Sequence, residues 1–129
     1  MRRTLITLAL LALAGPAAAH ASPTQESYFQ DDDQLEFSTP THVAKVLDQL
    51  KGLGVDRIRV TVFWGSVAPS PNANAKPKGF DGSDPDAYEQ AKWDRYDTLA
   101  KLAQARGIGV MWDIAGPAPN WATPSPSRR

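Results

Sequence analysis

Apolar residues along the chain repeat with two different periods, and the longer period predicts helices. Between residues 40 and 51, apolar side chains fall at the i, i+3, i+4 and i+7 spacing of one helical face: Val43, Val46, Leu47 and Leu50. Thr39 followed by Pro40 is a typical helix start, because threonine caps the first turn and proline is tolerated there. Gly52 and Gly54 supply the stop. The pattern predicts an amphipathic helix from residue 40 to about residue 52.

A second helix is expected after residue 84. Asp84-Pro85 repeats the combination of a capping residue and a proline. Arg106-Gly107 is a typical helix end, with a cation and then a glycine. The apolar face between them consists of Trp93, Tyr96, Leu99, Ala100 and Ala103.

Residues 57–64 alternate with period two, which predicts a strand. One side is wholly apolar and consists of Ile58, Val60, Val62 and Trp64. The other side mixes charge, hydroxyl and aromatic groups: Arg57, Arg59, Thr61 and Phe63. This mixture is unusual for a solvent-facing side, so we expect it to line an enclosed polar site.

Two further strands flank these elements. A short aromatic strand is expected at residues 27–30, directly before Asp31-Asp32-Asp33, and a buried strand at residues 108–115. The order of strands and helices predicts βαβ units, a parallel sheet and an α/β fold. Because the first turn carries negative aspartates instead of a phosphate-binding glycine loop, we favour a barrel over a nucleotide-binding sheet.

Two loops are candidates for function. Residues 65–84 form a long loop rich in Pro, Asn and Gly, a type that compact domains usually keep for function or leave disordered. Residues 116–121 form a second, rigid loop. Residues 125–129 have no packing pattern and are expected to be an unstructured tail.

The first 21 residues have the pattern of a secretory signal peptide. Arg2-Arg3 precedes the apolar run Leu5 to Ala14, and Ala19-His20-Ala21 is a small-x-small cleavage site. An apolar run of about ten residues is too short to span about 30 Å of hydrocarbon. We therefore expect a secreted or periplasmic protein without stable membrane insertion.

Composition excludes several kinds of partner. The 14 Lys and Arg balance the 14 Asp and Glu, and no basic stripe suggests nucleic acid. The chain has no cysteine, which removes disulfides, thiolate nucleophiles and cysteine-based zinc sites. His20 and His42 are too far apart in sequence to suggest a ligand pair. No metal and no cofactor are expected.

Several segments resemble a known clan of enzymes. Leu53-Gly54-Val55, residues 57–60, Trp93-Asp94, residues 106–108 and Asp113 are similar to the (β/α)₈ glycoside hydrolases that include the family 5 cellulases. The resemblance covers roughly residues 26–124. It implies that Arg59 supports the catalytic nucleophile and that Asp113 lies near the sugar. Ala115 stands where family 5 often has a histidine.

The candidate site would take a carbohydrate at the carboxyl ends of the strands. Carboxylate and amide groups bind paired sugar hydroxyls, and an indole ring packs on the apolar face of a pyranose. The candidate residues are Asp32, Arg59, Asp113, Asn120 and Trp121. Alternatives remain open: Trp121 could pack on its loop, Arg59 could form a structural ion pair, and the three aspartates could form a solvated turn.

The resemblance also implies what the chain lacks. In that clan the two catalytic groups are glutamates that end the fourth and seventh strands, and retaining hydrolysis needs them about 5–5.5 Å apart. Glu26, Glu36 and Glu89 end no convincing barrel strand, so no catalytic residue is assigned.

We therefore expect residues 22–124 to form the first three βα units of a (β/α)₈ TIM barrel. The chain would then be a truncated, cellulase-like glycoside hydrolase that is inactive alone, with a C-terminal barrel portion as a missing partner. A small secreted carbohydrate-binding or interaction module is the alternative. Assembly with itself or with a separate C-terminal piece is also open.

Overall fold

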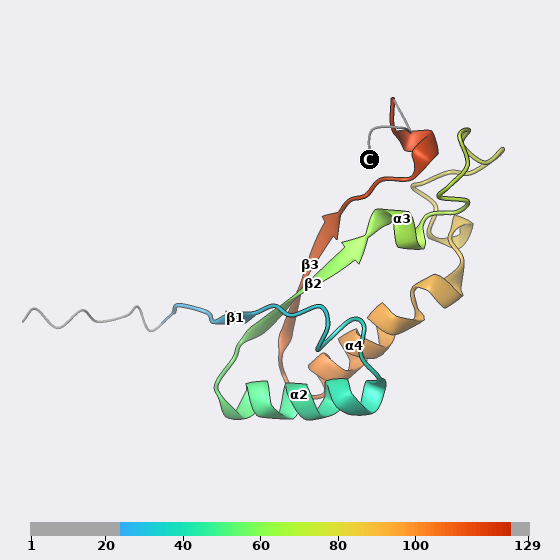
Figure 1. The fold of residues 1–129 in the computed structure, drawn as a ribbon. Coiled ribbons are helices and arrows are strands. Elements are labelled where there is room, and N and C mark those ends of the chain that lie inside the picture. Colours follow the sequence, from blue (N-terminus) through green and yellow to red (C-terminus); the bar gives the residue numbers. More distant parts are fainter. Residues whose placement is uncertain (1–23, 125–129) are drawn as a thin grey trace, which may run out of the picture.

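The computed structural model describes residues 24–124 (Figure 1). The expected signal peptide, residues 1–21, and the expected tail, residues 125–129, lie outside the described residues. The strands are β1 (Tyr28–Phe29), β2 (Arg57–Phe63) and β3 (Gly109–Ala115). The α-helices are α2 (Pro40–Gly52), α3 (Trp64–Val67) and α4 (Asp94–Gln104). Three short 3₁₀ turns complete the order: η1 (Pro85–Ala87), η2 (Gln90–Lys92) and η3 (Asn120–Ala122).

The strands form one parallel sheet in the order β1-β2-β3. β2 and β3 pair along their whole length, from Arg57 opposite Gly109 to Phe63 opposite Ala115. α2 connects β1 to β2, and α4 lies between β2 and β3. Because parallel crossovers are right-handed and the strand order runs in one direction, both helices lie on the same face of the sheet. The described part is thus a two-layer arrangement with helices on one face of the sheet (Figure 1).

The expected partial TIM barrel is wrong. The described residues form a small open α/β fold, a three-stranded parallel sheet with α2, α3 and α4, and nothing in it closes toward a barrel. The side of β2 that was expected to be enclosed is open at Arg59, whose side chain is 42% exposed. A period-two pattern of apolar residues predicts that a strand has one apolar side, but it does not indicate whether the sheet closes into a barrel. The ion pairs of Arg57 with Glu26 and of Arg59 with Asp113 account for the charged residues on this side of β2 without an enclosed interior.

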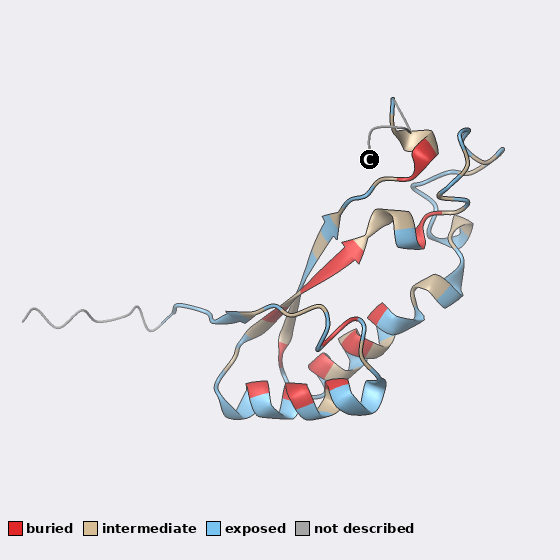
Figure 2. Cartoon of the chain, in the orientation of Figure 1, coloured by how far each residue is buried: buried red, intermediate tan, exposed pale blue. Residues whose placement is uncertain are grey.

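The hydrophobic core lies between the sheet and the two long helices (Figure 2). The apolar stripe of α2 and the apolar side of β2 meet there, as expected from their periods. Leu47 and Ile58 at the centre are fully buried. The other buried members from the long elements are Val43, Val46, Leu50, Val60, Val62, Tyr96, Leu99 and Ala103.

The start of α2 is confirmed in detail, whereas two other boundaries differ from expectation. The Thr39 hydroxyl accepts a hydrogen bond from the His42 amide at 3.3 Å. Asp84 caps only the short turn η1, because the chain leaves helical geometry at Tyr88 before α4 begins. Trp64 begins α3 instead of continuing β2.

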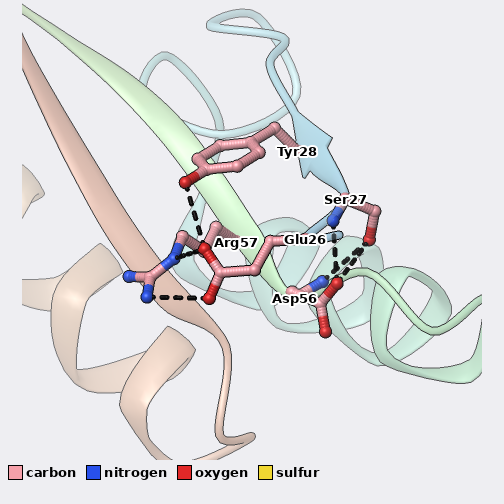
Figure 3. A network of polar contacts seen from close by, with 5 residues as sticks. All are labelled: Glu26, Ser27, Tyr28, Asp56 and Arg57. Carbon is pink, nitrogen blue, oxygen red and sulfur yellow. Dashed lines mark hydrogen bonds and ion pairs between the residues drawn. The ribbon is translucent and has the colours of Figure 1, made fainter. Parts of the chain in front are cut away.

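Side chains from the start of the sheet attach β1 to β2 (Figure 3). Arg57 donates two hydrogen bonds to Glu26, at 2.6 and 2.9 Å. The Asp56 carboxylate accepts from the amide and the hydroxyl of Ser27, at 2.8 and 3.0 Å. Because β1 has only two residues, these contacts supplement a very short ladder and help to fix its register.

Residues 109–115 form the expected strand, but the expectation that this strand is buried is wrong. β3 is an edge of the sheet, and α4 contacts it through Tyr96, whose ring packs against Trp112 at 6.2 Å. Trp112 is 44% exposed and Ile114 is 66% exposed.

Among residues 24–124, no helix has the length and apolar character needed to cross a membrane.

Candidate functional site

A pocket lies at the carboxyl ends of β2 and β3, where the chain leaves the sheet. Its volume is about 460 Å³, within the range of about 300–1,000 Å³ that is typical of small-molecule sites. The two loops singled out in the sequence both contribute to it. Its lining residues are Phe37, Phe63, Gly65, Ser66, Pro71, Asn72, Pro117, Ala118 and Asn120.

Two phenylalanine rings form the aromatic part of this carboxyl-end pocket. Phe37 and Phe63 are stacked, with ring centroids 6.1 Å apart and an interplanar angle of 26°. Phe37 is 55% exposed, although it belongs to the lining. The guanidinium of Arg95 lies 6.0 Å from the centroid of the Phe37 ring, a cation–π contact that helps to hold the ring in place. An exposed, held ring is a plate on which a ligand could stack.

Asn120 is the most constrained polar group of the pocket. Its backbone amide donates to the Pro71 carbonyl at 2.7 Å, and its Nδ2 donates to the Asn72 carbonyl at 3.0 Å. The residue is 8% exposed, yet its Oδ1 has no hydrogen-bond partner within the described part of the chain. A buried amide oxygen without a donor costs free energy, so binding of a ligand that supplied a donor would be favoured once the atoms covering this oxygen moved aside.

The loop beginning at Gly65 touches the loop beginning at Gly116. The Gly65 amide donates to the Pro117 carbonyl at 2.9 Å. A Cβ atom on Gly65 would lie 2.8 Å from that same oxygen, so only glycine permits this approach. The Gly116–Pro117 peptide bond is cis. The two loops therefore form one joined wall of the pocket.

Trp121 follows Asn120 but is not part of the pocket lining. Its ring packs edge-to-face against Trp64 and Phe80, at centroid distances of 5.9 and 5.7 Å. Its indole N–H donates to the Pro69 carbonyl at 3.1 Å. These contacts agree with packing of the loop, the alternative left open from sequence. Stacking of Trp121 on a sugar stays a prediction.

Arg59 and Asp113 are brought together, but apart from the carboxyl-end pocket. They form an ion pair of 2.5 Å across β2 and β3. Arg59 also donates to Gln30 at 3.2 Å. Both residues face the open side of the sheet, and neither belongs to the pocket lining.

Glu36 is a buried acid that sequence reasoning did not single out. Its Oε1 accepts from the Tyr96 hydroxyl at 2.7 Å, and Arg95 lies 3.7 Å away. Burial, and to a lesser extent the charge of Asp32, raises the pKa of Glu36 above its ordinary value, although the Tyr96 hydrogen bond opposes this. The same burial, with the Glu36 contact, raises the pKa of Tyr96.

Asp32 belongs to this buried group rather than to the carboxyl-end pocket. Its Oδ1 is buried and has no hydrogen-bond partner among residues 24–124. Its neighbour Asp31 accepts from the Gln34 amide at 3.1 Å, as expected for a turn. A lone glutamate between Leu35 and Phe37 gives no periodic signal, so only the folded structure reveals the contact with Tyr96.

Of the five candidates, only Asn120 lines the carboxyl-end pocket. Within the described residues, no group of three or more His, Cys, Asp or Glu side chains is arranged to hold a metal ion. The chain matches no protein-family model, and no curated protein sequence matches it. The geometry of the carboxyl-end pocket is therefore the main indication of function.

Proposed function

We propose that the protein binds a neutral carbohydrate in the carboxyl-end pocket. The observation that carries the proposal is the buried, unpartnered Oδ1 of Asn120 in a pocket that also contains the Phe37 and Phe63 rings. A sugar hydroxyl would donate to the amide oxygen. The apolar C–H face of the same sugar would pack against the exposed Phe37 ring.

The charge of the lining supports a neutral ligand. The polar side chains that line the pocket, Ser66, Asn72 and Asn120, are all uncharged. The lining, which lies wholly in the described part, contains no lysine or arginine to neutralise a phosphate or a sugar acid. A glycan of uncharged sugars satisfies the hydrogen-bonding groups without introducing an unpaired charge.

The direct test is a calorimetric titration of the full chain with cellotriose, maltotriose and a charged glucuronate oligosaccharide. We expect the neutral glycans to bind with a Kd of about 0.1–1 mM and the charged glycan to bind more weakly. The Phe37→Ala variant should lose about two- to tenfold in affinity, which corresponds to a stacking contribution of about 0.5–1.5 kcal/mol.

Tyr28→Ala is the matched control. Tyr28 is 53% exposed, close to the 55% of Phe37, but it lies at the opposite end of β2 beside Arg57. Its replacement should leave the affinity for neutral glycans unchanged. Equal losses in the two variants, or tighter binding of the charged glycan, would refute the proposal.

Hydrolysis of a glycosidic bond is the second candidate. The ion pair between Arg59 and Asp113 favours it, because the resemblance to glycoside hydrolases places both residues near the sugar. No Asp or Glu lines the carboxyl-end pocket, however, so the described residues supply no catalytic pair there. We therefore propose binding without catalysis by this pocket, and expect no release of nitrophenol from nitrophenyl glycosides.

We also propose that the protein acts outside the cytoplasm, on the evidence of the signal-peptide pattern in residues 1–21. N-terminal sequencing of the protein from the medium or the periplasm should give Ser22 as the first residue. Recovery of full-length chain only from the cytoplasm would contradict this.

A further inference from the structure

A second pocket lies beside the start of α4 and shares no lining residue with the carboxyl-end pocket. Its volume is about 430 Å³. Its walls come from the turns η1 and η2 and from the first turn of the helix. The lining residues are Gly82, Ser83, Pro85, Tyr88, Gln90, Trp93 and Asp97.

Two aromatic rings in this helix-start pocket stand almost perpendicular to each other. The Tyr88 and Trp93 centroids are 6.1 Å apart, and their planes meet at 85°. The Tyr88 hydroxyl donates to the Gly82 carbonyl at 3.0 Å, and its ring packs edge-to-face on Phe80 at 5.3 Å. Trp93 packs against Tyr96 at 5.7 Å and against the core. Both rings are therefore held in position before any ligand arrives.

The charge of this pocket is negative. Asp97 is the single charged residue in its lining, all of which belongs to the described part. The Asp97 carboxylate accepts from Gln90 at 2.9 Å, which orients it. The ammonium of Lys92 is engaged elsewhere, with the Ala68 carbonyl at 3.0 Å and with Glu89 at 3.1 Å.

The surrounding sequence strengthens the negative field. Residues 79–91 contain no lysine or arginine. A run of acidic groups without intervening cations attracts positive ligands. The acidic residues of this segment without an ion-pair partner in the described part of the chain are Asp81, Asp84 and Asp86, whereas Glu89 is paired with Lys92.

We propose that the helix-start pocket binds a small organic cation that carries a quaternary or methylated ammonium group. Perpendicular aromatic faces with one carboxylate provide cation–π attraction together with charge pairing. A hard metal ion fits less well, because it requires several oxygen ligands, and one oriented carboxylate supplies too few. The proposal is independent of the carbohydrate pocket.

Tryptophan fluorescence of the full chain tests this proposal, with choline as the cation and dimethylbutanol as its uncharged carbon isostere. Choline should quench or shift the summed emission of the four tryptophans saturably, through its effect on Trp93, and dimethylbutanol should bind about tenfold more weakly or not at all. Asp97→Asn should weaken choline binding about five- to tenfold.

Asp94→Asn is the matched control, because it removes the same charge from the same helical turn but lies outside this pocket. It should change choline affinity by less than about twofold. Tyr88→Leu keeps an apolar side chain and should weaken choline about fivefold, with an unchanged circular dichroism spectrum as evidence of folding. No saturable choline binding, equal affinity for the uncharged isostere, preferential binding of a neutral glycan, or no effect of Asp97→Asn would each overturn the proposal.

Discussion

The hydroxyl of Tyr96 on α4 donates a 2.7 Å hydrogen bond to Glu36, whose side chain is only 1% exposed. This contact joins the segment after β1 to the helix that precedes β3, 60 residues away in sequence. The adjacent Phe37 lines the carboxyl-end pocket. Glu36 is thus the chain neighbour of a pocket-lining residue, although its own side chain is not part of that lining.

Glu36 should make stability fall as the pH rises. Its pKa is raised in the folded chain by burial, whereas it is near 4.5 in the unfolded chain. The folded state then binds more protons than the unfolded state above about pH 4.5, so the free energy of unfolding decreases as the pH rises toward the folded-state pKa. Glu36→Gln removes this titration.

Urea unfolding of both proteins between pH 4 and pH 8 provides the measurement. The difference in stability, variant minus wild type, should become more positive as the pH rises through this window. Exposed carboxylates such as Asp48 and Asp56, whose pKa values are lowered by hydrogen bonds, cancel in the comparison. A difference that is independent of pH would contradict the assignment.

Gly65→Ala should destabilise the protein by about 1–3 kcal/mol, since the new methyl group would meet the Pro117 carbonyl oxygen. Glycan affinity should fall with it, because the two loops form one wall. Gly52→Ala is the control: nothing lies within 4 Å of its added Cβ, at the end of α2. Thermal unfolding measures the change in stability, and calorimetric titration measures the change in glycan affinity. Equal changes in the Gly65→Ala and Gly52→Ala variants would argue against a wall formed by the two joined loops.

Asp113→Asn should change the free energy of unfolding by no more than about 1 kcal/mol. The partner side chains are 42% and 33% exposed, and such ion pairs are weakened by solvent and salt. Neutral glycan affinity should stay the same, because neither Arg59 nor Asp113 lines the carboxyl-end pocket. A large loss of glycan binding on titration would instead support the role implied by the hydrolase resemblance.

Ile114→Lys should reduce self-association at high protein concentration. β3 is an edge strand on which Ile114 and Trp112 are exposed, and a lysine blocks edge-to-edge pairing. Leu53→Lys replaces an equally apolar residue that is 80% exposed at the end of α2, away from this edge. Light scattering should show a decrease for the first variant only; equal decreases would point to a general effect of charge.

Local sequence patterns predicted the elements better than their assembly. The capping pair Thr39-Pro40 and the alternation in β2 depend on neighbouring residues, and both are confirmed. Closure of the sheet and the exposure of Trp112 depend on which elements lie beside β3, and no local period encodes that.

The candidate site likewise contains one residue that the sequence could indicate and others that only the folded structure reveals. Asn120 could be proposed from its place in a rigid loop after a strand, and the structure places it in a pocket. Phe37 lies in no periodic pattern, so its stacking on Phe63 could not be anticipated. The partnership of Glu36 with Tyr96 likewise depends on the packing of distant segments.

The carbohydrate proposal is tested most directly by nuclear Overhauser contacts between cellotriose and phenylalanine rings, in protein whose phenylalanines alone are protonated. The chain has four phenylalanines, so the assignment is tractable. We predict contacts from the sugar C–H protons to Phe37 and Phe63, and none to Phe29 or Phe80. Contacts to Phe29 or Phe80 alone, or no contacts at saturating cellotriose, would contradict the account.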